Sequence, residues 1–251
     1  MLNKGLKMQF RPNYDLIRAW EDSDRAFSDL YHAPYVAIFE CNGKTLVYMC
    51  DKHDANISFD MVDACFNCLG LAKPDVLLTE FANAGREMTQ RQFQVNTLAY
   101  AAGVASKHNV PVVLADLSDD QMLDVLRSRY PMRKFSVKDL GRFLSGPMRF
   151  RGEDGEMGIA INMFGRDRFM LDNIAMALNK YNVVFAIFGS GHYEQQRLAL
   201  IDMLGEPKYI TKIPNMRGEF DSKNIKEEKL VDFKIGETIN DTVKAGQSSG
   251  R

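Results

Sequence analysis

Short apolar runs alternate with amphipathic stretches along most of this chain, and the alternation predicts strands followed by helices. Runs of strand length lie at 35–39, 45–50, 76–80, 110–116, 183–188 and 208–212. Apolar residues at helical spacing predict helices at 14–30, 58–72, 88–107, 119–129, 166–180 and 194–204. Such an order is typical of a mostly parallel sheet covered by helices. We therefore expect an α/β fold with a mixed, mostly parallel central sheet flanked by helices on both faces.

Two local signals define turns within this pattern. Asn42-Gly43 separates the first two apolar runs, which predicts a type I′ hairpin and hence one antiparallel pair. Ser118 precedes Asp119, Asp120 and Gln121, which is the signature of a helix N-cap. The hairpin makes the expected sheet mixed rather than purely parallel.

The same pattern divides the chain into three parts. Residues 1–33 are mixed in character and form an N-terminal extension, residues 34–211 hold the α/β domain, and residues 212–251 form a polar C-terminal segment that we expect to be partly disordered. Within the domain, residues 131–165 combine glycines, charges and isolated hydrophobic residues. This stretch predicts a cap or a loop insertion over the site.

Composition bounds the class of protein. With 251 residues, 45% of them hydrophobic and 26% charged, the chain suits one large α/β domain or two small ones. The net charge of −1 gives no electrostatic signature for nucleic acid or an anionic membrane. No apolar run approaches the ~20 residues that span a bilayer, and the N-terminus lacks the apolar core of a signal peptide. The expected location is therefore cytoplasmic.

The cysteine pattern argues against a secreted disulfide framework. The four cysteines are Cys41, Cys50, Cys65 and Cys68. Cys65 and Cys68 form a C-x-x-C pair, which raises redox and zinc hypotheses, but both fall within the helix expected at 58–72, and a second pair is absent. We interpret them as small buried hydrophobic residues.

Candidate catalytic groups recur where strands end. The chain places an acid or an imidazole at or just after four expected strands: His53, Glu80, Asp116 and His192. In parallel sheets ligands bind beyond the carboxyl ends of the strands, so these side chains should meet at one edge. Gly189-Ser-Gly-His192 is the most informative of these stretches, because its glycines permit a sharp turn and a close approach to a ligand.

Two imidazoles and two carboxylates suit a divalent metal site. A metal with three protein ligands keeps a position open for water and lowers the pKa of that water toward ~7, and a carboxylate outside the ligand set can act as general base. The sequence leaves open whether Glu80 is ligand or base. Simpler interpretations also stand: structural histidines, Asp116 as a helix cap, a Glu80–Arg86 salt bridge, and Asp167 as an acid favoured by the dipole of a helix starting at Arg166.

The order of these motifs resembles a known family. It runs through the strand before His53, Pro74-Asp-Val-Leu-Leu-Thr-Glu80 with Arg86, Val112-Val-Leu-Ala-Asp116, Arg166-Asp-Arg-Phe-Met170 and Gly189-Ser-Gly-His192. This order, over residues 35–205, resembles the TraB/PrgY/GumN/Tiki family, which is grouped with the erythromycin-esterase and ChaN-like proteins. The second G-x-x-H motif of the family fits fully at 189–192, whereas Cys50 replaces the glycine of the first. The C-terminal transmembrane helices of many TraB-type members are missing.

The resemblance implies a metal-dependent hydrolase, because Tiki-like members are manganese- or cobalt-dependent peptidases. It implies His53 and His192 as metal ligands together with Glu80, and Asp116 as a further ligand or a nearby acid. Arg86 and Arg166 would orient the acids or stabilise an oxyanion. The expected cofactor is manganese, cobalt or zinc, and the expected substrate is a peptide, an amide or an ester.

Two alternatives remain open at this stage. One is a non-catalytic module that sequesters a peptide or a small ligand on the same scaffold. The other is a partner-bound subunit with a relic site. Whether the chain forms a homo-oligomer also stays open.

Overall fold

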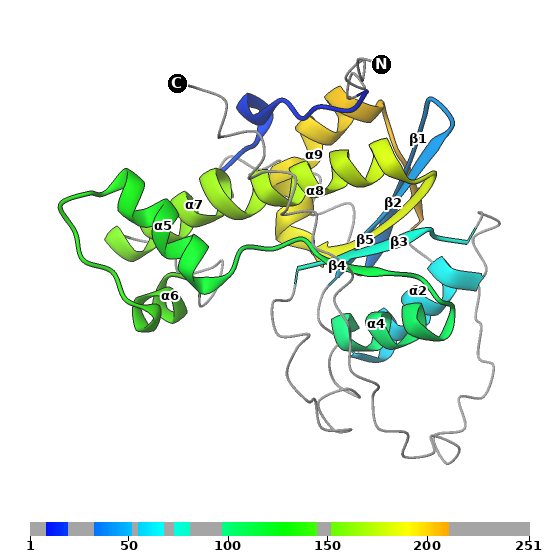
Figure 1. Ribbon diagram of the computed structural model, residues 1–251, viewed down its shortest axis with the longest axis horizontal. Coiled ribbons are helices and arrows are strands. Elements are labelled where there is room, and N and C mark those ends of the chain that lie inside the picture. Colours follow the sequence, from blue (N-terminus) through cyan, green and yellow to red (C-terminus); the bar gives the residue numbers. More distant parts are fainter. Residues whose placement is uncertain are drawn as a thin grey trace, which may run out of the picture.

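The computed structural model describes residues 9–19, 33–51, 55–67, 73–80, 97–144 and 152–210. The described residues form a six-stranded sheet in the order β4-β3-β5-β2-β1-β6, with helices packed on both faces (Figure 1). The strands are β1 Tyr35–Cys41, β2 Lys44–Asp51, β3 Val76–Thr79, β4 Val112–Leu114, β5 Val183–Gly189 and β6 Lys208–Ile210. Strands β4, β3, β5 and β2 are parallel, whereas β1 is antiparallel to β2 and β6. The expected α/β class with a mixed, mostly parallel sheet is confirmed.

The β1–β2 hairpin forms at the predicted turn. Cys41 pairs with Lys44, so Asn42 and Gly43 are the two turn residues. Their φ angles of 52° and 76° are both left-handed, as a type I′ turn requires. The local sequence therefore determines this turn.

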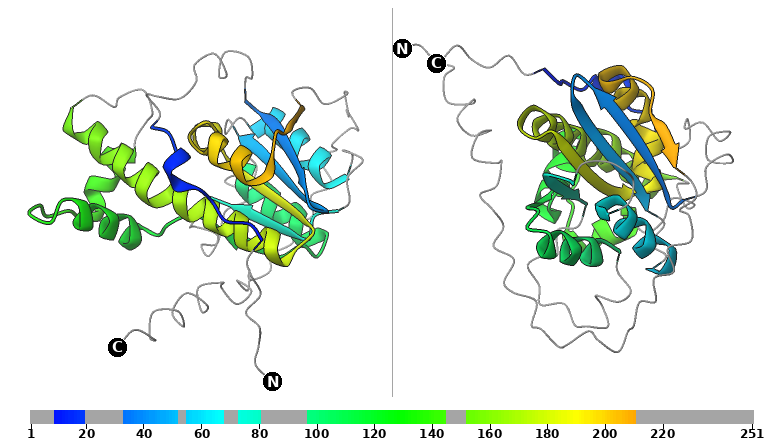
Figure 2. Two further views of the ribbon diagram at one scale, coloured as in Figure 1. Left: turned by 90° about the horizontal axis from the view of Figure 1, so that it is seen from above. Right: turned by 90° about the vertical axis from the view of Figure 1, so that its right-hand side faces the viewer.

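Alternate side chains of the strands fill two apolar layers. On β5, Val184, Ala186 and Phe188 pack toward α8 Asp167–Lys180 and α9 Ser190–Leu204. Phe185 and Ile187 point the other way, toward α2 Ala55–Asn67 and α4 Thr97–Lys107. The two helix pairs cover opposite faces of the sheet (Figure 2). Because both faces are buried, the central strand is apolar throughout.

A short segment of the predicted N-terminal extension belongs to the first of these layers. Phe10 and Ile17 are buried against it. Only Tyr14–Leu16 is helical here, as one 3-10 turn, and residues 17–19 are not helical. The helix expected at 14–30 is therefore wrong at 17–19, and residues 20–30 lie outside the described part.

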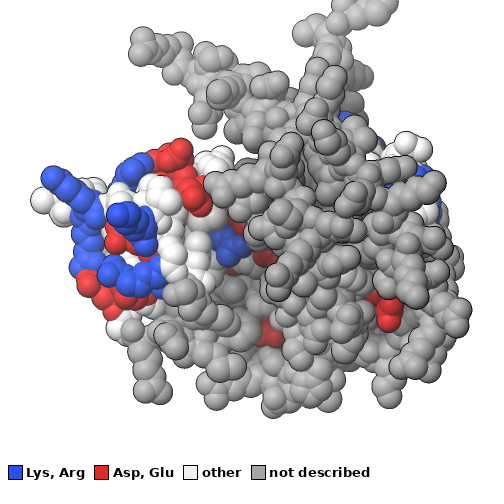
Figure 3. Space-filling model, turned by 90° about the horizontal axis from the view of Figure 1, so that it is seen from below, with Lys and Arg blue, Asp and Glu red and all other residues white. Residues whose placement is uncertain are grey.

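A lobe of three helices extends beyond the sheet. It consists of α5 Asp119–Arg129, α6 Val137–Leu144 and α7 Glu153–Ile161, which share their own apolar cluster (Figure 1). The stretch 131–165, expected as a cap or loop, contributes α6 and α7 to this lobe. Cationic and anionic side chains intermingle on its surface (Figure 3). Helix α5 starts with the predicted cap, since Ser118 and Gln121 form a capping box.

The sequence predicts a helix that begins at Arg166. In the structure, helical backbone already precedes this residue. Ile161, Asn162, Arg166 and Asp167 all have right-handed helical backbone, so α7 continues through a π-helical turn at Asn162–Arg166 into α8. Such π turns place one extra residue in a helix and are frequent at functional sites. Arg166 is the last residue of this turn.

Candidate functional site

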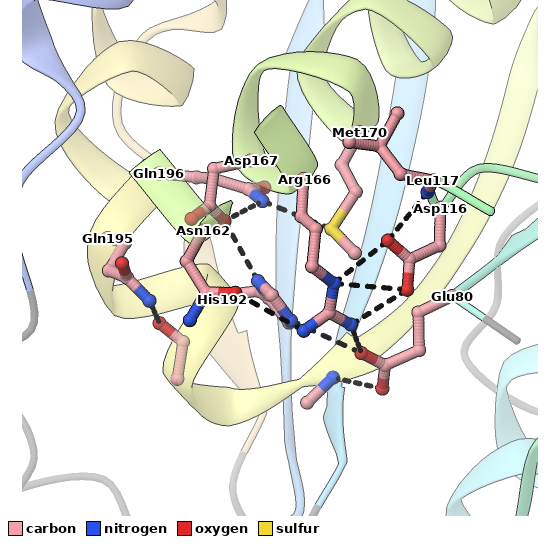
Figure 4. A network of polar contacts seen from close by, with 12 residues as sticks. Glu80, Asp116, Leu117, Asn162, Arg166, Asp167, Met170, His192, Gln195 and Gln196 are labelled. Carbon is pink, nitrogen blue, oxygen red and sulfur yellow. Dashed lines mark hydrogen bonds and ion pairs between the residues drawn. The ribbon is translucent and has the colours of Figure 1, made fainter. Parts of the chain in front are cut away.

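The carboxyl ends of three neighbouring strands bring Glu80, Asp116 and His192 together. Glu80 follows β3 directly, Asp116 lies two residues after β4, and His192 lies three residues after β5. Thr79 of β3 pairs with both Leu114 of β4 and Ile187 of β5, which aligns the three strand ends. Arg166 reaches the same place from the π-helical turn (Figure 4). The structure thus assembles four of the six residues that the sequence nominated.

Arg166 forms a bidentate ion pair with Asp116. Its Nε lies 2.9 Å from Oδ1 and its Nη2 lies 2.7 Å from Oδ2. The Asn162 amide oxygen accepts from Nη1 at 3.3 Å. Both side chains of the pair are largely buried, with 16% and 6% exposed. Both carboxylate oxygens of Asp116 are therefore engaged by the guanidinium.

The charges around Arg166 maintain its protonation. Burial lowers the pKa of the guanidinium, but the nearby Asp116, Glu80 and Asp167 carboxylates raise it, and the net shift is upward. Arg166 is therefore a permanent cation among three acids.

Two donors from different parts of the chain hold the carboxylate of Glu80. The backbone N–H of Gly189 donates to its Oε1 at 2.8 Å, and Oε2 lies 3.5 Å from Arg166 Nη2. Gly189 is the N-cap of α9, which lacks a side-chain cap, so the carboxylate of Glu80 meets the positive end of that helix. These two donors fix the position of the Glu80 carboxylate.

His192 lies inside the first turn of α9, and not in a loop before a helix starting at Glu194. Gly189 has φ −57° and ψ 143°, and the helix begins directly afterwards at Ser190. The chain therefore turns directly from β5 into α9, and Gly189 makes this turn with a conformation that is open to other residues. The helix itself directs the imidazole of His192 toward the strand ends.

The imidazole of His192 is held between two carboxylates. Its Nδ1 lies 2.9 Å from Asp167 Oδ1, and its Nε2 lies 3.4 Å from Glu80 Oε2. Because an ionised carboxylate only accepts hydrogen bonds, Nδ1 carries a proton. Nε2 then faces a second acceptor, and this approach is repulsive unless a proton or a cation lies between the two atoms.

The spacing of Nε2 and Oε2 fits either occupant. Two donors bound at about 2.1 Å to one tetrahedral metal ion are about 3.4 Å apart. The carboxylate on Nδ1 matches the arrangement common behind metal-bound histidines. Glu80 and His192 thus suit two ligands of one metal ion, and they equally suit a shared proton.

Two nominated residues, His53 and Arg86, lie outside the described residues. Asp51, two positions before His53, pairs with Gly189. Across the described ranges, from residue 9 to residue 210 with their gaps, no group of three or more His, Cys, Asp and Glu side chains could hold a metal ion. Any three-ligand site therefore needs a donor beyond Glu80 and His192.

Sequence reasoning missed the roles of Asp167 and Gln196. The sequence places Asp167 at a helix start, but the helix continues through it and its backbone N–H donates to the carbonyl oxygen of Asn162. Its carboxylate is fully buried and accepts from His192 and from Gln196 Nε2, the latter at 2.7 Å. The spacing of four residues between His192 and Gln196 could have indicated that both face one partner.

The cysteines take no part in the described site. Cys50 and Cys65 are buried free thiols, and burial raises the pKa of each well above its usual value. Cys68 lies outside the described residues. A buried neutral thiol is a poor nucleophile, which agrees with the interpretation of Cys65 as a hydrophobic residue of a helix.

Comparison with known proteins gives no relative. No family model, no curated protein and no solved structure matches this chain. Within the described residues, no helix is long and apolar enough to cross a membrane. The function must therefore be inferred from the site itself.

Proposed function

We propose that this protein is a metal-dependent hydrolase that cleaves a peptide, amide or ester bond. One observation carries the proposal: His192 Nε2 and Glu80 Oε2 point at one another across 3.4 Å, while Asp167 occupies Nδ1 of the same imidazole. A cation between the two acceptors relieves their repulsion. The resemblance of the motif order to TraB/Tiki-type peptidases supports the same assignment.

The donor set fits a divalent metal ion in part. Glu80 and His192 supply one carboxylate oxygen and one imidazole nitrogen, which suit manganese, cobalt or zinc. His53 is the candidate for the remaining protein ligand. When bound, such a metal lowers the pKa of water enough to make it a nucleophile near neutral pH.

The other residues prepare the site. Asp167 holds the imidazole with its proton on Nδ1, so that the Nε2 lone pair is directed at the metal position. The amide of Gly189 orients Glu80, and Arg166 binds both carboxylate oxygens of Asp116 beside it. The guanidinium of Arg166 also lies beside Glu80. In this position it would stabilise negative charge that develops on an oxygen of a substrate bound there.

The test is hydrolysis of chromogenic esters, amides and short peptides by metal-stripped protein reloaded with manganese, cobalt or zinc. We expect turnover that requires metal and falls by about 10²–10⁴-fold in Glu80→Gln and His192→Ala. Turnover that survives chelation, or that either variant retains, would contradict the proposal. Metal binding without turnover of any of these classes would instead favour a sequestering module.

A further inference from the structure

Strand β4 forms one edge of the sheet, since β3 is its only neighbour among the described strands. The carbonyl oxygen of Pro111 accepts from the backbone of β3, and the N–H of Ala115 donates to it. In a parallel ladder, alternate residues of a strand direct both backbone groups toward the same neighbour. Pro111, Val113 and Ala115 therefore face β3, whereas the backbone groups of Val112 and Leu114 point away from the sheet.

These outward groups form an open edge. Within the described part of the chain, the backbone N–H and C=O groups of Val112 and Leu114 have no hydrogen-bond partner. The faces of the strand are covered, because the side chains of Val112 and Val113 pack against the two apolar layers on opposite sides of the sheet. An extended chain laid beside β4 would find one donor and one acceptor at each of two positions.

The opposite edge of the sheet is guarded by charge, and β4 is not. Strand β6 carries Lys208, whose side chain is 79% exposed and pairs with Glu40 of β1. Charged side chains on an edge strand discourage another strand from pairing with it. Strand β4 consists of Val112, Val113 and Leu114, an apolar segment without charge. Its sequence therefore suits the addition of a strand.

The open edge runs directly into the candidate site. Asp116 follows Leu114 by two residues, and its carboxylate binds Arg166. The same guanidinium reaches Glu80 at the end of β3 (Figure 4). Neighbouring strands lie about 4.8 Å apart, so a strand added to β4 would lie about 10 Å from β3. About three residues of extended chain cover that distance and reach the position between Glu80 and His192.

We propose that the outer edge of β4 binds the peptide substrate as an added strand and leads it into the site. The backbone of the peptide pairs with Val112 and Leu114, and the chain beyond passes over Asp116 toward Glu80 and His192. The substrate class is therefore an extended, unfolded peptide of about six residues or more, about three along β4 and about three across the strand ends. The inference rests on the proposed function for the cleavage of this peptide, but not for its binding.

Amide hydrogen exchange of metal-free wild type, followed by NMR, tests the edge itself. We expect the amides of Val112 and Leu114 to exchange freely, while those of Val113 and Ala115 are protected. An excess of a random-sequence decapeptide library should slow the first two by about 10-fold. Unchanged exchange in the presence of the library would overturn the proposal.

Protection of Leu114 in the absence of peptide would also overturn it. Protection that is lost on dilution would mean that a second copy of the chain occupies the edge. Protection that persists on dilution would mean that another segment of the same chain covers it.

A proline variant tests the role of the edge in turnover. Leu114→Pro removes one outward N–H, and proline is tolerated on an edge strand where the N–H faces solvent. Val137→Pro is the matched control, because Val137 is an apolar residue, 51% exposed, at the first position of α6, where proline is favoured. In metal-loaded protein, we expect Leu114→Pro to lower kcat/KM for the decapeptide library by about 10-fold relative to Val137→Pro. Equal values would overturn the proposal, and if Leu114→Pro does not fold, the exchange measurement on wild type decides.

The two experiments separate this inference from the proposed function. If no metal-loaded form cleaves the library, but the library protects Val112 and Leu114, the hydrolase proposal falls and the peptide-binding edge stands. If both variants cleave the library equally and the exchange of β4 is unchanged, the hydrolase proposal stands and the inference about the edge falls.

Discussion

Arg166 and Asp116, 50 residues apart in the chain, form a bidentate pair in which Nε and Nη2 bind the two carboxylate oxygens. The pair joins the π-helical turn to the segment after β4. Nη2 also lies 3.5 Å from Glu80 Oε2, beyond the end of β3. One guanidinium thus links three elements whose ends form the site.

Removal of this guanidinium should destabilise the fold markedly. In Arg166→Met, the buried carboxylate of Asp116 loses its counter-ion, which costs about 3–5 kcal/mol of unfolding free energy. Arg127 is a suitable control, because its pair with Asp124 is exposed, at 51% and 72% of the two side chains. Arg127→Met should cost less than about 1 kcal/mol. Urea unfolding of both variants measures the difference, and equal losses would show that the buried pair is not a structural link.

Gly165 should not tolerate alanine. A Cβ at this position in the π-helical turn would lie 2.9 Å from Leu117 Cδ1 and 3.0 Å from Val125 Cγ2. We expect Gly165→Ala to cost about 1–3 kcal/mol through overpacking against α5. Gly141 in α6 has open space around its Cβ position, so Gly141→Ala should stabilise by about 0.5–1 kcal/mol. Thermal unfolding of the two variants gives the comparison, and a neutral Gly165→Ala would show that the close approach is unimportant.

Asp63 should make stability depend on pH. Burial raises the pKa of its carboxyl, although the hydroxyl of Tyr100 donates to it. A pKa raised by folding means that the folded state holds the proton more tightly. The associated stability is fully present below the usual aspartate pKa of about 4 and is lost as the pH rises through the raised value.

The variant Asp63→Asn mimics the protonated form at every pH. It should therefore be more stable than wild type at neutral pH and should lose this advantage on acidification to about pH 4 and below. Urea unfolding across this pH range measures the effect. An advantage that does not change with pH would mean that Asp63 is not the titrating group.

The elements predicted well are those whose signals are local. Asn42-Gly43 defines the hairpin through its own backbone preferences, and Ser118 defines the start of α5 through its own side chain. Strand β5 was predicted because both of its faces are buried and its sequence is therefore a continuous apolar run. Neither the turn nor the cap needs a distant partner.

The errors lie where tertiary contacts determine the backbone. Gly191 weakens helix propensity at the start of α9, yet the helix extends back to Ser190, where the carboxylate of Glu80 accepts from Gly189 N–H. The continuous helix through Asn162–Arg166 was also missed. Its π turn has no local sequence signal, and Arg166 is fixed there by contacts with Asp116.

The sequence predicted residues that form the site, but it did not predict how their side chains contact one another. Strand-end positions indicated Glu80, Asp116 and His192, because parallel strand ends share one edge. That Asp167 holds His192 depends on how α8 packs beside α9, and that Arg166 occupies both oxygens of Asp116 depends on how the π-helical turn lies beside the segment after β4. Side-chain pairing between distant elements cannot be read from the spacing within either element.

The central claim is that Glu80 and His192 share a metal ion, and elemental analysis after loading with manganese, cobalt or zinc tests it most directly. Wild type and His192→Ala are compared with the control variant His108→Ala. The imidazole of His108 stacks on the ring of Phe66, with 5.5 Å between the ring centroids, and it is not part of the site. We predict about one metal ion per chain in wild type and in His108→Ala, and loss of the metal in His192→Ala. Metal-free wild type, or undiminished metal in His192→Ala, would contradict the claim.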